Sequence, residues 1–144
     1  MDKTITTLLR SHNLKVTKIR KAVIRLLLEK GVAMSHSEIL EALENDKDLD
    51  VDKVTLYRTL NTFTELGIAH KVASEDRSWL YAIYEREIHE HDTHEHAHFF
   101  CTSCDKIYCF PVENIKLHTS IDNPQGFQIN HQEVRLHGTC PICQ

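Results

Sequence analysis

Residues 52–84 read DKVTLYRTLNTFTELGIAHKVASEDRSWLYAIY, and the order of their patterns predicts a helix followed directly by a β-hairpin. Asp52 is a good N-cap for this helix, and Gly67 ends it. Between them the apolar side chains recur three and four residues apart, at Leu56, Leu60 and Phe63. Two β-rich runs then flank a polar turn at residues 74–77, which predicts the hairpin.

Two more helices are predicted upstream of this stretch. In residues 16–30 apolar side chains again recur at helical spacing, and a glycine follows them as a stop signal. Residues 35–45 open with Ser35 and Glu38, which match the S-x-x-E pattern of a capping box. Three helices followed by a hairpin is the order of a winged helix-turn-helix, so we predict such a domain over residues 1–83.

The face of the third helix opposite its apolar stripe carries groups that bind phosphates and base edges. They are Lys53, Thr55, Tyr57, Arg58 and Asn61. Residues 1–30 carry eight Lys and Arg against two acidic side chains, whereas residues 84–144 carry four basic and nine acidic ones. A basic end of this kind suits contact with a polyanion. The alternative is an ordinary amphipathic helix in a protein whose surface charge simply varies.

Length and composition are those of a globular protein of one or two small domains. The chain has 144 residues, of which 41% are hydrophobic and 26% charged. No apolar run approaches the roughly 20 residues that span a bilayer, and residues 1–15 lack the apolar segment of a secretory signal. We therefore expect a cytoplasmic protein without a membrane partner. In a reducing cytosol its five cysteines favour metal ligation over disulfides.

Four of the cysteines form two C-x-x-C knuckles, and this spacing directs two thiolates of a tight turn at one ion. The pairs are Cys101 with Cys104 and Cys140 with Cys143. Two such pairs complete a closed tetrahedral shell, the pattern of a structural zinc site. The alternative is two unrelated reactive pairs.

Histidines surround the first knuckle and point to a second metal site. His96 and His98 fall on one face of a predicted strand, and Cys109 belongs to neither knuckle. Alternatively, Cys109 is a small buried hydrophobe and the histidines form a solvated polar hinge. The H-E-x-x-H match at residues 94–98 lacks the helix that a metalloprotease needs, so no enzyme is expected. We predict a histidine-rich hinge over residues 84–95 and a metal-binding domain over 96–144.

These residues together resemble the ferric uptake regulator (Fur) family of bacterial metal-sensing repressors. VDKVTLYRTLNTFTELGIAHKV resembles its recognition helix and wing entry, HAHFFCTSCDKI its H-x-H-x-x-C-x-x-C strand, and LHGTCPIC its closing G-x-C-x-x-C. The resemblance implies an α+β fold, with an N-terminal winged helix-turn-helix followed by a small α/β dimerisation domain. It also implies a homodimer that binds double-stranded operator DNA, a structural zinc on the four cysteines and a regulatory divalent metal near the hinge.

Carried over residue by residue, His96 and His98 fall on ligands of the regulatory site, and Cys109 falls where family members commonly have Asp or Glu. Tyr57 falls on a base-contacting aromatic, and Lys15 on a cation that contacts the minor groove or the backbone. The fourth regulatory ligand is sought among three histidines, His89, His91 and His118.

Departures from the family pattern bear on which metal is sensed. Ala82 stands where many members have a carboxylate, and Ala97 stands where some do. Cys109 stands at a third position where a carboxylate is common. Imidazole and thiolate suit zinc, so we predict zinc rather than ferrous iron as the effector of a transcriptional repressor. Acidic residues near the hinge, Glu90, Asp92, Glu95 and Glu113, could restore an iron site. The rival function is a zinc-buffering or metal-delivery protein that contains a winged-helix module.

Overall fold

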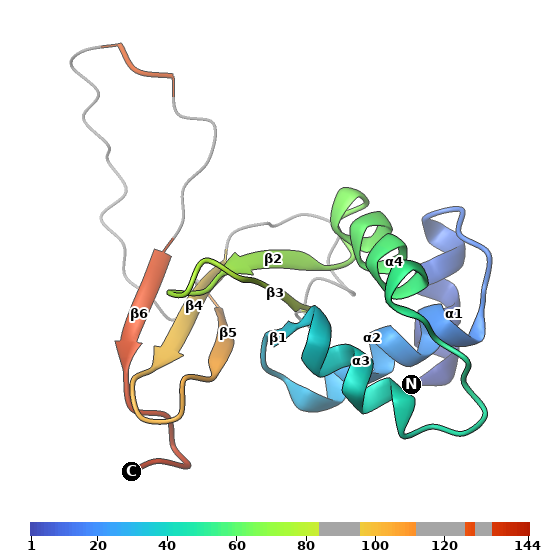
Figure 1. The fold of residues 1–144 in the computed structure, drawn as a ribbon. Helices are drawn as coiled ribbons and strands as arrows, with labels where there is room; N and C mark the ends of the chain where they lie inside the picture. The colour runs from blue at the N-terminus through green and yellow to red at the C-terminus, as the bar shows by residue number, and fades with distance from the viewer. Residues whose placement is uncertain (84–95, 112–125, 129–133) are drawn as a thin grey trace. The chain divides into compact units, whose positions relative to one another are not determined.

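The chain forms two compact units, Met1–Asp92 and Thr93–Gln144. The computed structural model describes residues 1–83, 96–111, 126–128 and 134–144 (Figure 1). The predicted hinge, residues 84–95, lies outside the described residues. Among the described residues, no helix is both long and apolar enough to cross a bilayer.

The described part of the first unit, residues 1–83, consists of four helices and a small antiparallel sheet. Its elements are α1 (Asp2–Ser11), α2 (Lys18–Lys30), β1 (Met34–Ser35), α3 (His36–Glu44), α4 (Lys53–Glu65), β2 (His70–Ala73) and β3 (Trp79–Ala82). The sheet order is β1-β3-β2, and the β2–β3 hairpin turns in the polar segment where the sequence predicts it. This is the winged helix-turn-helix architecture, with one helix more than predicted.

The additional helix, α1, precedes the three that the sequence predicts. Its buried side chains are Ile5, Leu8 and Leu9, and the helix packs against α2. This apolar pattern covers little more than one helical turn, so the periodicity of residues 1–11 is a weak signal by itself. Burial against α2 stabilises the helix instead.

The other three helices begin at side-chain caps that the local sequence supplies. Thr17, Ser35 and Asp52 each accept a hydrogen bond from a backbone N–H in the first helical turn. At α3 the capping box is complete, because the Glu38 side chain also accepts from the Ser35 N–H at 3.1 Å. Each such cap typically contributes about 1 kcal/mol.

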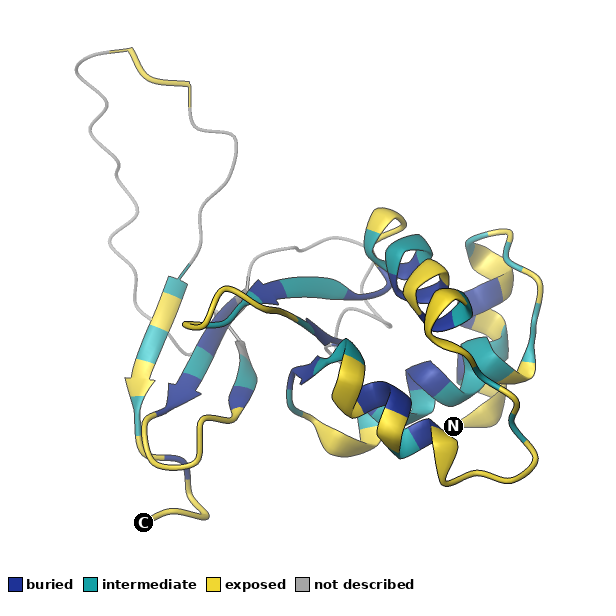
Figure 2. Ribbon diagram, in the orientation of Figure 1, coloured by how far each residue is buried: buried dark blue, intermediate teal, exposed yellow. Residues whose placement is uncertain are grey.

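One hydrophobic core holds the first unit together, and α4 contributes its centre. Leu56, Leu60 and Phe63 are fully buried, as the apolar stripe predicts. They pack with side chains from α1, α2, α3 and the sheet, and the opposite face of α4 is largely exposed (Figure 2). Because each fully buried side chain of this size contributes about 1.5–3 kcal/mol, the core fixes which face of α4 points to solvent.

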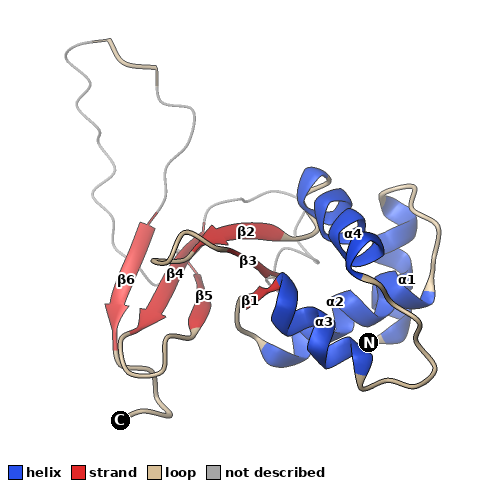
Figure 3. Ribbon diagram, viewed as in Figure 1, coloured by secondary structure: helices blue, strands red, loops and turns tan. Residues whose placement is uncertain are grey.

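The described part of the second unit is a three-stranded sheet with the order β5-β4-β6 (Figure 3). The strands are β4 (His96–Cys101), β5 (Ile107–Pro111) and β6 (Val134–Gly138). β4 pairs antiparallel with β5 and parallel with β6. A Cβ at Gly138 would lie 3.3 Å from the Phe99 ring, so glycine lets β6 end close to β4. The predicted α+β class agrees with this architecture.

Candidate DNA-binding surface and metal centre

The outward face of α4 presents the polar groups that the sequence analysis selects. Lys53, Tyr57 and Arg58 are exposed, and Tyr57 keeps 53% of its surface accessible. Thr55 is half-buried. Val54, which the sequence analysis does not select, is 58% exposed on the same helix and could contact a thymine methyl group. A cation, a guanidinium, a phenol and an apolar group thus share one accessible helix.

Asp52 fixes where α4 begins. Its carboxylate accepts from the Thr55 N–H at 2.7 Å. Hydrogen bonds from the Thr55 backbone and then the Thr55 side chain hold the pKa of Asp52 below its ordinary value. The cap is therefore ionised at neutral pH, and its charge complements the positive end of the helix dipole.

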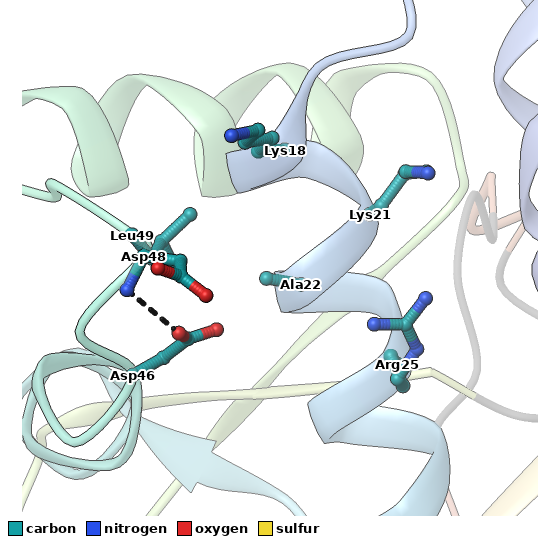
Figure 4. A pocket seen from close by; sticks show the side chains of 7 residues that line it. All are labelled: Lys18, Lys21, Ala22, Arg25, Asp46, Asp48 and Leu49. Atoms are coloured by element: carbon teal, nitrogen blue, oxygen red, sulfur yellow. Dashed lines mark hydrogen bonds between the residues drawn. The ribbon is translucent and has the colours of Figure 1, made fainter.

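Lys15 is exposed in the segment that joins α1 to α2, and its carbonyl accepts from Arg20 Nη1 at 2.7 Å. On α2, Lys18, Lys21 and Arg25 line one side of an open hollow of about 300 Å³. Asp46, Asp48 and Leu49 lie across it (Figure 4).

Asp2 partly neutralises this basic row, because its Oδ1 lies 2.7 Å from Arg25 Nη2 and 3.5 Å from Lys21 Nζ. Both ion pairs are solvent-exposed and therefore contribute little to stability. Lys15 and Lys18 are exposed cations at the start of α2 for which no ion pair is described.

In the second unit the two C-x-x-C knuckles converge on one point. Their ligand sulfurs all lie within 4.8 Å of one another, and Cys104 Sγ is 3.8 Å from Cys140 Sγ. A tetrahedron with Zn–S bonds of about 2.3 Å has edges of about 3.8 Å, so the cluster has the dimensions of a zinc tetrathiolate.

Pairing between β4 and β6 brings these knuckles together across the long segment that separates them. Cys101 is the register partner of Gly138, and the Thr102 N–H donates to the Gly138 carbonyl at 2.8 Å. Cys140 follows two residues later, and its backbone N–H donates to Cys101 Sγ at 3.4 Å.

The four thiols differ in acidity because their hydrogen bonds differ. The backbone N–H of Cys140 lowers the pKa of Cys101 to about 6. Burial opposes ionisation of Cys140, but the Tyr108 hydroxyl, which donates to it, helps to keep its pKa below the ordinary value. The same bond raises the pKa of Tyr108 to about 12.

The other two thiols ionise less readily. The Lys106 N–H favours the Cys104 thiolate, but burial and the neighbouring sulfurs outweigh it, so the pKa of Cys104 is raised. The pKa of Cys143 is raised to about 12, and its hydrogen bond with Cys140 is the largest cause. Four thiolates at this spacing repel one another, and a divalent cation would relieve that repulsion.

His98 and Cys109 form a second pair of potential metal ligands in the same sheet. They are direct register partners on β4 and β5. Residues opposite each other in an antiparallel pair place their side chains on the same face. A ring nitrogen of His98 and the Sγ of Cys109 lie within 4.8 Å of each other, and His98 is 6% exposed. A buried imidazole thus lies beside a half-buried thiol.

The remaining predicted ligands are not brought together by the described residues. His96 belongs to β4 by its backbone, but its side chain is outside the description. His89, His91 and His118 lie outside the described residues altogether. Their roles stay predictions. Ala97, which stands where some members of the family that the sequence resembles have a carboxylate, is fully buried between its strand neighbours.

Comparison with known proteins connects both units to one family. Residues 11–137 match the family model described as "Ferric uptake regulator family". A peroxide-responsive repressor of Staphylococcus aureus is 26% identical over 137 residues, which cover 94% of this chain and 86% of that protein.

Solved structures show the same fold. A zinc uptake regulator complexed with zinc and DNA is 25% identical, with a TM-score of 0.72, over 96% of this chain and 89% of the other. The Vibrio cholerae ferric uptake regulator is 22% identical, with a TM-score of 0.65, over 94% of this chain and 98% of the other.

Proposed function

This chain belongs to the ferric uptake regulator family, whose members are metal-responsive transcription regulators rather than enzymes, and we propose that it is a zinc-dependent repressor of metal uptake or homeostasis genes. The observation that carries this proposal is the outward face of α4, where Tyr57 and Arg58 stand exposed above a buried apolar stripe. The position of the domain boundaries is part of the proposal: DNA binding in residues 1–83, a hinge in 84–95, and metal binding and dimerisation in 96–144.

The DNA-binding step is assigned to α4 and to the start of α2. Tyr57, Arg58 and Thr55 contact base edges in the major groove, while Lys15 and Lys53 contact the phosphate backbone or the minor groove. A homodimer in the cytoplasm presents two such surfaces to a palindromic operator, whose half-sites are separated by a whole number of helical turns.

A structural zinc is assigned to Cys101, Cys104, Cys140 and Cys143. The sulfur spacing of 3.8 Å supports it, and so do the N–H and O–H donors that stabilise the negative charge on two of the sulfurs. With four protein ligands there is no open coordination position, so this ion would stabilise the second unit without exchanging readily with free metal.

The regulatory metal is assigned to His98 and Cys109, with His96 and one of His89, His91 or His118 as further ligands. The His98–Cys109 pair supports zinc over ferrous iron, because one donor is a thiol where family members commonly carry a carboxylate. Ala82 and Ala97 remove carboxylates from positions that would favour iron. Metal binding at this regulatory site fixes the chain around the ion and raises the affinity of the protein for its operator. DNA binding must then raise the affinity for the metal by the same factor.

An operator titration under reducing conditions tests the proposal, with Zn²⁺, Fe²⁺ and Mn²⁺ compared at matched free concentrations. The probe is a duplex selected from a random library by the wild-type protein. We expect Zn²⁺ to promote binding at the lowest free concentration. Activation by Fe²⁺ where Zn²⁺ is inert would overturn the zinc assignment but not the repressor assignment.

The same titration separates the repressor from a zinc-buffering or metal-delivery protein. A repressor binds the selected duplex with an affinity that falls steeply with salt, by about 0.9 log unit per log salt for each neutralised phosphate. A buffering protein would take up zinc and select no duplex. His96→Ala should abolish metal-dependent DNA binding while the four-cysteine zinc remains, which distinguishes the two metal sites.

A further inference from the structure

His36 lies at the first position of α3 and contacts α4 through two different groups. Its Nε2 is 3.1 Å from the carbonyl oxygen of Lys53. Its ring centroid lies 6.2 Å from that of Tyr57, with the two planes tilted by 59°. A carbonyl oxygen only accepts, so Nε2 carries the proton and donates. One side chain thus touches both the first turn of α4 and the ring of its exposed tyrosine.

The local sequence holds His36 rigidly in this place. Ser35 caps α3, and its complete capping box with Glu38 fixes the backbone where the histidine begins the helix. Ser35 is also anchored in the sheet, opposite Leu80 of β3. His36 itself is half-buried. The backbone at His36 is therefore determined by both a helix cap and a strand pairing.

We propose that His36 is a positioning residue that sets the orientation of Tyr57 for reading DNA. This inference rests on the proposed DNA-binding function of α4. A tilted aromatic pair is directional, since the ring edge of one partner meets the face of the other. The hydrogen bond to Lys53 holds the imidazole in place while that contact is made. Tyr57 is 53% exposed, so without His36 its ring samples more rotamers and meets a base less often.

The two contacts can be removed separately by substitution. His36→Gln retains an N–H donor for the Lys53 carbonyl and loses the ring. His36→Phe retains the ring against Tyr57 and loses the donor. His36→Ala loses both. His12→Ala is the matched control, because His12 also bonds a helix carbonyl, that of Leu8 at 3.0 Å, but caps α1 rather than contacting α4.

The experiment measures the affinity of the metal-loaded protein for two duplexes, the one selected by wild type and a scrambled duplex of the same composition. We expect His36→Ala to weaken binding to the selected duplex by about fivefold to tenfold, the loss of one aromatic contact and one hydrogen bond. Binding to the scrambled duplex should be unchanged, since phosphate contacts do not depend on the Tyr57 ring. His36→Phe should restore part of the loss, and His12→Ala should cause none.

A double-mutant cycle with Tyr57→Ala distinguishes positioning from support of the fold. In the Tyr57→Ala background, His36→Phe and His36→Gln should become equivalent on the selected duplex, because no ring remains to be oriented. Equal losses on both duplexes, or no loss in any His36 variant, would overturn the inference. If His36→Ala does not fold, the Phe and Gln variants give the same comparison. If wild type selects no duplex, the proposed function fails, and the inference with it.

Discussion

Replacing Cys140 by serine is expected to release one zinc ion per chain. Cys140 is 1% exposed, and its Sγ lies 3.8 Å from that of Cys104. Zinc binds small structural sites with about 10–16 kcal/mol. A neutral hydroxyl is a poor zinc ligand, so the loss of one thiolate in four removes about 2.5–4 kcal/mol, if the ligands share the energy evenly. Zinc affinity should fall about 60- to 700-fold.

The loss of zinc should destabilise the second unit selectively. Among the described residues, the large hydrophobic core of the first unit is built from residues between Ile5 and Ile83. The described part of the second unit buries few side chains, namely Ala97, His98, Phe100, Cys101, Ile107 and Cys140. Its sheet therefore depends on the metal for much of its stability. Calorimetry should show a lower melting temperature for the second unit of Cys140→Ser and an unchanged one for the first.

The assay for the ion itself is competition with a colorimetric zinc chelator, followed by zinc analysis of the dialysed protein. Ser103→Ala is the control, since it changes an exposed residue within the first knuckle and removes no proposed metal ligand. If Cys140→Ser held its zinc against the chelator as wild type does, the assignment of Cys140 as a ligand would be refuted. Equal destabilisation of both units would refute the argument about their separate cores.

Four further substitutions test the DNA surface, the regulatory site and the helix cap. Tyr57→Ala should relax base preference at the selected duplex, whereas Lys15→Ala should weaken all duplexes alike and reduce the salt slope by about 1; binding-site selection and salt titration measure the two effects. Cys109→Asp should shift activation from Zn²⁺ towards Fe²⁺ or Mn²⁺ in operator titrations, because it restores a hard oxygen donor. Because folding lowers the pKa of Asp52, its carboxylate stabilises the folded protein. This contribution is fully present above the ordinary pKa of an aspartate, and it is lost as the pH falls through the lowered pKa of the folded state. Asp52→Asn keeps a capping side chain without a charge, so the acid denaturation curve of this variant should lack this contribution. A curve identical to that of wild type would contradict the assignment.

The sequence by itself determines the features that depend on neighbours along the chain. The caps at Ser35 and Asp52 and the apolar stripe through Leu56, Leu60 and Phe63 are local signals, so both the start of α4 and its buried face follow from them. The exposure of Tyr57 follows in turn, because at 3.6 residues per turn it lies about a quarter turn to the side of this apolar stripe. The spacing within each C-x-x-C knuckle is equally local.

Tertiary structure alone decides what meets across long distances in the chain. That the two knuckles share one point depends on the parallel register of Cys101 with Gly138. That Cys109 faces His98 depends on the antiparallel register of β4 and β5. The contact of His36 with Lys53 depends on how α3 packs against α4. A shift of one residue in either strand pairing would move every side chain to the opposite face. Such registers are set by the summed packing of many side chains, and a local sequence pattern does not contain that sum.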